Sequence, residues 1–336
     1  MKKILILHNT TDNTRIDEAD TLIQVSEISR ALKELNYIVD IGTIGNSLSD
    51  IEKLITYHRP HLVFNIVESF CGSDKNQYLI PAYLETLGIT YTGCPSSALF
   101  LTGNKIIAKK IMLGSNILTP AYFDEKSFSG DINESTKLIV KSQTEHASFA
   151  MDANSIVIGK TAAWNLMKQK KELHGGEWMA EQYIDGREIN VSVMGKQSEP
   201  QILPIPELVF KDFPEGVPKI FDYPTKWEPQ SHGYINTYRI FIDEKAEYML
   251  SDKIKDVILQ CWNSFKIEGY ARVDFRVDEQ GNPWVLEINT NPCLTSDGGF
   301  IAASEKLGLS YNQTINHIME ITNHESIVDI KKTAIF

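Results

Sequence analysis

The segment 270–289 limits the fold of this chain more than any other, because polar and apolar side chains alternate along it. Alternation with period two predicts two β-strands, and the Gln280-Gly281 dipeptide between them predicts a hairpin turn. Apolar side chains of both strands are expected to build core on one face of this hairpin: Val273, Phe275, Leu286 and Ile288.

The other face of the predicted hairpin brings two carboxylates together. Asp274 lies opposite Glu287, and Arg272 lies opposite Asn289. Directly opposed carboxylates repel one another, so the arrangement favours a hard cation between them, with Asn289 as a third oxygen ligand. Periodicity alone leaves a second interpretation open, in which all four residues form an ordinary solvated polar face.

The first part of the chain, about 100 residues, alternates strand and helix patterns in the manner of βαβ units. The predicted strands are 3–7, 38–44 and 62–67, and the predicted helices are 21–35, 51–58 and 77–87. This order predicts an α/β unit with a doubly wound parallel sheet. Because no Gly-x-Gly-x-x-Gly follows the first strand, a dinucleotide site is not indicated.

The rest of the chain mixes helices and strands in the α+β manner. Helices are predicted at 97–113, 162–173, 245–265 and 312–322. Strands are predicted at 137–141, 155–158, 178–184, 189–194 and 201–209. The stretch 211–234 carries prolines and aromatic residues without periodicity, which predicts an irregular, mobile loop of functional importance.

Composition excludes some classes of function. A net charge of −11 argues against general binding to nucleic acid or anionic membranes. The apolar runs are far shorter than the ~20 residues of a membrane-spanning helix. The basic, apolar start of the chain is too short for a signal peptide and predicts a strand. The four cysteines have no metal-binding spacing, which is typical of reduced thiols and predicts a cytoplasmic protein.

A series of motifs resembles those of ATP-grasp ligases, closest to the D-alanine–D-alanine ligase group. The hairpin contributes Ala271-Arg-Val-Asp-Phe and Leu286-Glu-Ile-Asn-Thr-Asn-Pro, which resemble the metal-binding signature of that family. Further matching segments precede it: Ile89-Thr-Tyr-Thr-Gly with Asn104-Lys105, Leu138-Ile-Val-Lys, Met179-Ala-Glu-Gln-Tyr-Ile-Asp-Gly-Arg-Glu and Tyr223-Pro-Thr-Lys-Trp. Any one of these motifs is weak, but their order makes the set specific.

The resemblance implies an ATP-grasp fold preceded by a Rossmann-like domain. The implied divisions are a pre-ATP-grasp domain (1–95), a small lobe (96–185), a large lobe with the metal site (186–325) and a C-terminal tail (326–336). The implied activity joins a carboxylate to an amine through an acyl phosphate, using ATP and two Mg²⁺ ions, with Mn²⁺ able to substitute. The implied partners are small-molecule amino acid, carboxylate and amine substrates, and a second copy in a homodimer.

The resemblance also implies roles for single residues. Those expected to bind the nucleotide are Lys105, Lys141, Glu181, Ile184 and Glu188. Those expected to act on the reacting groups are Arg272, Lys226 and Ser148, and the metal ligands are Asp274, Glu287 and Asn289. Lys109 is expected to be a solvated surface lysine, and Cys293 a packed residue beside the site.

The substrate-binding motifs depart from the family. Its Gly-Gly-x-Ser-x-Glu element, whose glutamate holds the first amino group, has no equivalent at 8–15. Its phosphate loop becomes His146-Ala-Ser-Phe-Ala, its carboxylate-binding serine–leucine pair becomes Gly298-Gly299, and its loop tyrosine becomes Trp227. We therefore expect a ligase with altered substrate pockets. Two alternatives remain open: a genuine D-alanine–D-alanine (or D-alanine–hydroxy acid) ligase, and a non-catalytic ATP-binding module, against which the retained Arg272 argues.

Overall fold

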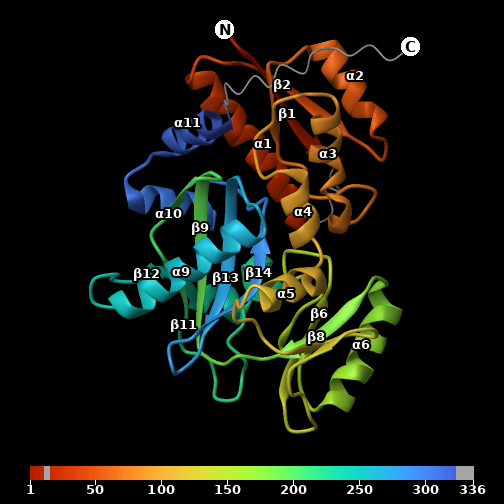
Figure 1. Cartoon of the computed structure of the whole chain (residues 1–336), viewed down its shortest axis with the longest axis vertical. Helices are drawn as coiled ribbons and strands as arrows, with labels where there is room; N and C mark the ends of the chain where they lie inside the picture. Colours follow the sequence, from red (N-terminus) through yellow and green to blue (C-terminus); the bar gives the residue numbers. More distant parts are fainter. Residues whose placement is uncertain (11–15, 323–336) are drawn as a thin grey trace.

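The N-terminal domain is built on a parallel sheet of order β2-β1-β3 in the computed structural model, which describes residues 1–10 and 16–322 (Figure 1). Its strands are β1 (Lys3–Asn9), β2 (Ile38–Ile44) and β3 (Leu62–Asn65), and its helices are α1 (Ile16–Glu34), α2 (Ser49–His58) and α3 (Leu79–Thr86). Ile4 and Ile6 of β1 pack against α1, whereas Leu5 and Leu7 pack against α2 and α3. Helices therefore cover both faces, and the predicted doubly wound α/β sheet is confirmed.

The small lobe is an antiparallel sheet of order β5-β4-β8-β6-β7 with helix α6 packed on it (Figure 1). Its strands are β4 (Tyr122–Phe123), β5 (Phe128–Ser129), β6 (Lys137–Ser142), β7 (Ile156–Ile158) and β8 (Trp178–Gln182), and α6 covers Lys160–His174. The single helix predicted at 97–113 is wrong. Two helices occur there, α4 (Ser96–Thr102) and α5 (Lys105–Gly114), because Asn104 leaves the helical conformation and caps α5 through its side chain.

The large lobe has a sheet of order β12-β11-β9-β13-β14, with β10 also paired to β9 (Figure 1). Its strands are β9 (Arg187–Lys196), β10 (Glu199–Ile202), β11 (Pro206–Phe210), β12 (Thr237–Phe241), β13 (Gly269–Val277) and β14 (Pro283–Asn289), and α9 (Tyr248–Ser264) packs on the sheet. The single strand predicted at 201–209 is wrong, since β10 and β11 are separate and Pro204 lies between them. The stretch 211–234 holds two short helices, α7 (Tyr223–Trp227) and α8 (His232–Asn236), capped by Asp222 and Ser231.

The hairpin of β13 and β14 has the predicted register at its functional end, where Asp274 faces Glu287 and Arg272 faces Asn289. A β-bulge follows Asp274, so that Phe275 pairs with Val285 and not with Leu286. Val285 therefore takes the buried core position, and Leu286 lines a cavity on the opposite face. The prediction that Leu286 belongs to the core face is wrong, because a bulge reverses the facing of the residues beyond it.

The chain closes with α10 (Gly299–Leu307) and α11 (Tyr311–Thr322). Ile315 and Ile318 of α11 share a core with Val25 and Ile28 of α1, so the end of the large lobe also packs against the N-terminal domain (Figure 1). The predicted tail at 326–336 lies outside the described residues. Within residues 1–10 and 16–322, every helix is too short or too polar to cross a membrane.

Candidate active site

A cavity of about 500 Å³ has walls from the N-terminal domain, the small lobe and the large lobe. Thr21 of α1, Lys141 of β6 and Arg272 of β13 all face it. Every site residue predicted from the sequence lines this cavity: Lys105, Lys141, Ser148, Glu181, Ile184, Glu188, Lys226, Arg272, Asp274, Glu287 and Asn289. The fold thus gathers in one place side chains that lie far apart in the sequence.

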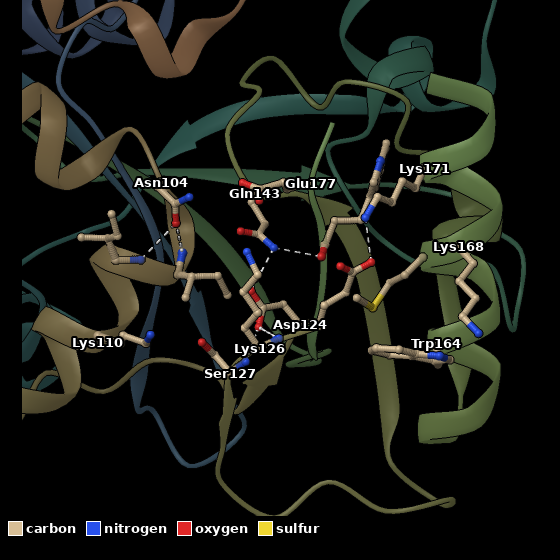
Figure 2. A pocket seen from close by; sticks show the side chains of 15 residues that line it. Asn104, Lys110, Asp124, Lys126, Ser127, Gln143, Trp164, Lys168, Lys171 and Glu177 are labelled. Atoms are coloured by element: carbon tan, nitrogen blue, oxygen red, sulfur yellow. Dashed lines mark hydrogen bonds and ion pairs between the residues drawn. The ribbon is translucent and has the colours of Figure 1, made fainter. Parts of the chain in front are cut away.

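A second hollow of about 350 Å³ lies between α5, the β4–β5 hairpin and α6 (Figure 2). Asn104, Lys168 and Lys171 line it, and Lys171 forms an ion pair with Glu125 at 2.8 Å. None of the predicted site residues lines this hollow. The larger cavity is therefore the candidate active site.

Lys105 enters the cavity from the first position of α5. Its buried ammonium donates a hydrogen bond to the backbone oxygen of Glu145 at 2.9 Å and lies 3.3 Å from Oε2 of Glu287. The cap at Asn104 sets where α5 begins, and so it also sets the direction in which Lys105 leaves the helix. A buried, held ammonium is a fixed positive charge suited to a phosphate oxygen.

Lys141 and Glu181 form an ion pair of 2.5 Å between the neighbouring strands β6 and β8. Glu181 also pairs with Lys109, whose Nζ lies 2.7 Å from Oε2. The prediction that Lys109 is a surface lysine is wrong, because its side chain is 0% exposed. Lys109 lies one helical turn after Lys105, on the inward face of α5. Residues four apart share a face of a helix, so the inward position predicted for Lys105 was the sequence signal for the burial of Lys109.

Glu188 is buried on β9 and forms an ion pair with Arg276 at 2.9 Å. Burial raises the pKa of the Glu188 carboxyl, and the charge of Arg276 opposes that rise. Sequence reasoning missed Arg276. The signal was its spacing, because residues two apart on a strand face the same side and Asp274 was already predicted at the site. Arg276 also donates to the backbone oxygens of Gly186 and Lys219. It thereby fixes the wall of the cavity around Glu188.

The two opposed carboxylates of the hairpin each have a cation of their own. Asp274 accepts two hydrogen bonds from Arg272, both at 2.7 Å. Glu287 lies 3.3 Å from Lys105 and 3.8 Å from Nδ1 of His146. Burial alone would raise the pKa of Glu287, but the charge of Lys105 and the hydrogen bond from His146 hold it well below its usual range. Cations already present in the chain therefore offset the repulsion deduced from the sequence.

Oxygen atoms suited to a hard cation surround these carboxylates. Asn289 leaves one lone pair of its Oδ1 free beyond the bond it accepts from the Asn291 amide at 2.9 Å. Asn190 lies beside Asp274 in the sheet, and its buried Oδ1 has no hydrogen-bond partner within the described residues. No group of three or more His, Cys, Asp or Glu side chains suited to a metal occurs in the described chain. Two carboxylates with amide oxygens fit Mg²⁺, which typically takes one or two carboxylates and completes its shell with phosphate and water.

The loop around Ser148 closes one side of the cavity. Ser148 has a positive φ of 58°, and its Oγ donates a hydrogen bond at 2.8 Å to the backbone oxygen of Phe221, next to α7. Lys226 of α7 lines the cavity, where burial, and after it the charge of Arg272, lowers the pKa of its ammonium. The indole nitrogen of Trp227 is buried without a hydrogen-bond partner in the described part of the chain. The predicted loop residues thus lie at the site in a short helix.

One wall of the cavity is apolar. Ile184 is 7% exposed and lines the cavity together with Leu286, Ile139 and Met151. A flat, apolar wall beside Glu188 is suited to a nucleotide base with its ribose. Leu286 was missed as a site residue because only the bulge brings it to this face.

The end of the cavity beside the start of α10 carries two carboxylates that were not predicted as site residues. Asp20 of α1 and Asp297 lie there, close to Gly298 and Gly299 at the start of α10. Burial raises the pKa of the Asp20 carboxyl, to which the Cys293 thiol donates a hydrogen bond at 3.1 Å. Burial also raises the pKa of Cys293 well above its usual value, so this thiol is not an activated nucleophile.

Arg239 of β12 also lines this end of the cavity, and sequence reasoning missed it. A Cβ atom placed on Gly299 would lie 3.6 Å from its Nη2. Burial, and after it the neighbouring charge of Arg272, lowers the pKa of Arg239. Within the described residues the guanidinium of Arg239 has neither a hydrogen bond nor an ion pair, although the charge of Asp297 acts on it.

Comparisons with known proteins agree with this geometry. The family described as "D-ala D-ala ligase C-terminus" matches residues 135–320. The Sinorhizobium fredii protein y4sG is 30% identical over 78% of this chain and 74% of its own length. The D-alanine–D-alanine ligase of Pelotomaculum thermopropionicum is 27% identical over 91% of this chain and 93% of its own.

Solved structures show the same fold. The D-alanine–D-alanine ligase of Bacillus anthracis, complexed with ATP, has a TM-score of 0.73 at 21% identity, over 96% of this chain and 97% of its own. The VanG D-Ala:D-Ser ligase of Enterococcus faecalis has a TM-score of 0.65 at 18% identity, over 96% and 99%. The ATP-grasp architecture expected from the motifs is therefore confirmed. With its ordered motifs gathered around one cavity, the chain belongs to the D-alanine–D-alanine ligase family, whose members are ATP-dependent ligases that form carbon–nitrogen bonds.

Proposed function

We propose that this protein joins a carboxylate to an amine through an acyl phosphate, in a pocket that is not built for two molecules of D-alanine. The observation that carries the proposal is the contrast between the two ends of the cavity. The end expected to hold the nucleotide carries the side chains that the resemblance implies for phosphate and metal binding, including Lys105, Lys141 and Asp274. The other end carries Gly298-Gly299 and the unpaired Arg239 instead of the family's serine–leucine pair.

At the nucleotide end, Lys105 and Lys141 would contact phosphate oxygens and Glu188 would accept hydrogen bonds from the ribose. Asp274, Glu287 and Asn289 would hold Mg²⁺, or Mn²⁺ in its place, which neutralises charge on the phosphates. The apolar wall at Ile184 would pack on the base. Lys105, Lys141 and Glu188 are each held by an ion pair in the protein, so these charges are placed before any ligand enters.

In the reaction, an oxygen of the substrate carboxylate attacks the γ-phosphorus of ATP, the bond to ADP breaks, and an acyl phosphate forms. The amine then attacks the acyl carbon, and inorganic phosphate leaves with the electron pair of the broken C–O bond. Lys226 would bind the phosphoryl group during transfer, and Arg272 would bind the oxyanion that forms at the acyl carbon. Both side chains line the cavity beside the predicted metal ligands. Closure of the loop near Ser148 would exclude water, which otherwise hydrolyses the acyl phosphate.

The glycine pair cannot simply be read as a lost serine. A Cβ atom on Gly298 would lie 2.9 Å from the backbone oxygen of Thr295, so this backbone does not accept serine there without a shift. Beside Gly299 stands the guanidinium of Arg239, which is near a second cation, Arg272. The guanidinium of Arg239 has no hydrogen bond or ion pair within the described residues, and this favours an anionic ligand beside it. We therefore assign Arg239 to a substrate carboxylate, and Asp20 with Asp297 to the substrate's amino group.

The experiment incubates the pure protein with ATP, Mg²⁺ and a panel of amino acids in pairs, each also supplied as its C-terminal amide. Phosphate release and mass spectrometry of the products are the readouts. We expect little D-alanyl-D-alanine, and a preference for the acid over the amide of about tenfold or more, since a contact to a charged group contributes roughly 1.5–3 kcal/mol. Arg239→Gln should abolish that preference, whereas Tyr238→Phe, next to it on β12, should keep it.

Three outcomes decide between the hypotheses. Turnover of D-alanine equal to that of the best pair would establish a genuine D-alanine–D-alanine ligase. If an amide were turned over as fast as the corresponding acid, Arg239 would not bind a substrate carboxylate. Binding of ATP without turnover of any pair would establish the non-catalytic module. The homodimer and the cytoplasmic location stay predictions, and the mass of the protein in solution tests the first of them.

A further inference from the structure

Three buried charges lie in a row behind the wall expected to face the nucleotide phosphates. Glu181 lies between Lys109 and Lys141, with ion-pair distances of 2.7 Å and 2.5 Å. The side chains of Lys109, Glu181 and Lys141 are 0%, 2% and 12% exposed. Of the three, Lys141 and Glu181 line the active-site cavity, and Lys109 does not.

Lys109 has a second contact that leads to the large lobe. Its Nζ donates a hydrogen bond to Oγ1 of Thr119 at 2.7 Å, and that hydroxyl donates to the backbone oxygen of Val285 at 2.8 Å. Val285 lies at the bulge of β14, two residues before Glu287. One ammonium therefore connects the sheet of the small lobe with the strand that carries a predicted metal ligand.

The charges of this row explain why a second lysine is needed. Glu181 carries one negative charge and touches Lys141 directly, so the two alone sum to zero. With Lys109 the row carries one net positive charge. We propose that Lys109 is a positioning residue that neutralises Glu181 and thereby leaves Lys141 with a net positive charge for an anionic nucleotide phosphate. The proposal rests on the phosphate-binding role of Lys141 in the proposed function, but not on the identity of the carboxylate or amine.

A purely structural role for Lys109 predicts a different pattern. If Lys109 served only to fill and stabilise the lobe, its replacement would lower stability, and removing the charge of Glu181 as well would not restore nucleotide affinity. If Lys109 acts by neutralising Glu181, the second substitution removes the negative charge and frees Lys141 again. A double variant therefore separates the two roles.

The test measures the affinity for ADP with Mg²⁺ by calorimetry, so it needs neither unidentified substrate. Lys109→Met should weaken binding by about tenfold or more, because Glu181, no longer neutralised by Lys109, would offset the charge of Lys141 inside the protein. Lys109→Arg should keep most of the affinity. Lys109→Met combined with Glu181→Gln should regain most of it, since the contact expected of residue 181 with the nucleotide base is made by its backbone. Lys110→Met is the matched control. Lys110 is the exposed neighbour of Lys109 on α5, so its replacement should leave the affinity for ADP unchanged.

A second measurement covers the case in which Lys109→Met does not fold. Burial lowers the pKa of Lys109 to about 8, against the opposing charge of Glu181. Lys141 and Lys105 also face it, and the Tyr122 ring, whose pKa burial raises, lies 5.8 Å away. Lys109 is charged below this pKa, so the affinity of the unmodified protein for ADP with Mg²⁺ should fall between pH 7.5 and pH 9.

The same pH change should leave Lys109→Arg almost unaffected, because arginine stays charged. Unchanged affinity in Lys109→Met, no recovery in the double variant, or equal pH profiles for lysine and arginine would each overturn the proposal. Protein that binds no ADP at all would overturn it together with the nucleotide site. Protein that binds ADP with this pattern but joins no substrates would refute only the proposed function.

Discussion

Replacing Asp274 by asparagine tests whether the chain's own cations, or an external metal, stabilise the opposed carboxylates of the hairpin. From the sequence alone, the change should relieve repulsion with Glu287, and stability without ligands should hold or rise. The structure reverses this expectation, since Asp274 accepts two hydrogen bonds of 2.7 Å from Arg272. Asparagine keeps one acceptor oxygen, and its NH₂ group faces a guanidinium donor.

The magnitude follows from this pair. A hydrogen bond to a charged group contributes about 1.5–3 kcal/mol, and breaking a buried ion pair costs up to about 5 kcal/mol. The side chains of Arg272 and Asp274 are 23% and 11% exposed, and Glu287 also stabilises Arg272, which reduces the loss. We therefore expect Asp274→Asn to lower the free energy of unfolding by about 2–3 kcal/mol, or the melting temperature by roughly 3–4 °C. Turnover of ATP with Mg²⁺ should be lost as well.

Thermal melting without ligands and urea denaturation measure the effect. Glu279→Gln is the matched control, because Glu279 lies in the same hairpin but is exposed at its turn. Its effect should stay within about 0.5 kcal/mol. If Asp274→Asn melted at the same temperature as the unmodified protein, or above it, repulsion between the carboxylates would dominate and the charge balance described above would be refuted.

Three further predictions concern other parts of the site. Arg276→Met should cost about 3–5 kcal/mol in urea denaturation, because Glu188 loses its buried partner. Burial raises the pKa of the Glu188 carboxyl, so the loss should be larger at pH 8 than at pH 4, and an equal loss at both would contradict this. Lys226→Gln should abolish phosphate release from ATP and change the affinity for ADP by no more than about twofold, since its proposed contact is to the transferred phosphoryl group. If phosphate release and ADP affinity were lost together, Lys226 would not act on the transferred group alone. Iodoacetamide at pH 7.5 should label the exposed Cys71 before Cys293, whose thiol has a raised pKa, and mass spectrometry after digestion would show the reverse order if Cys293 were reactive.

Local patterns were enough to predict much of this protein. Alternation with period two gave the facing of Asp274 and Glu287, because a strand's geometry fixes which side chains lie opposite one another. The order of the motifs led to the ATP-grasp fold, and every site residue predicted from them lines one cavity. These features depend on spacing along the chain, and spacing is visible in the sequence.

Contacts between distant segments were decided only by the tertiary structure. Lys109 looks like a surface lysine until β8 brings Glu181 to it, because a lysine is almost never fully buried unless it is paired. Leu286 looks like a core residue until the bulge turns it toward the cavity. Arg239 cannot be assigned to the site until the start of α10 places Gly299 beside its guanidinium. The sequence alone determined which side chains could act and on which strand faces they lie. The tertiary structure decided which charges neutralise one another, because that balance depends on distances between segments that no local pattern encodes.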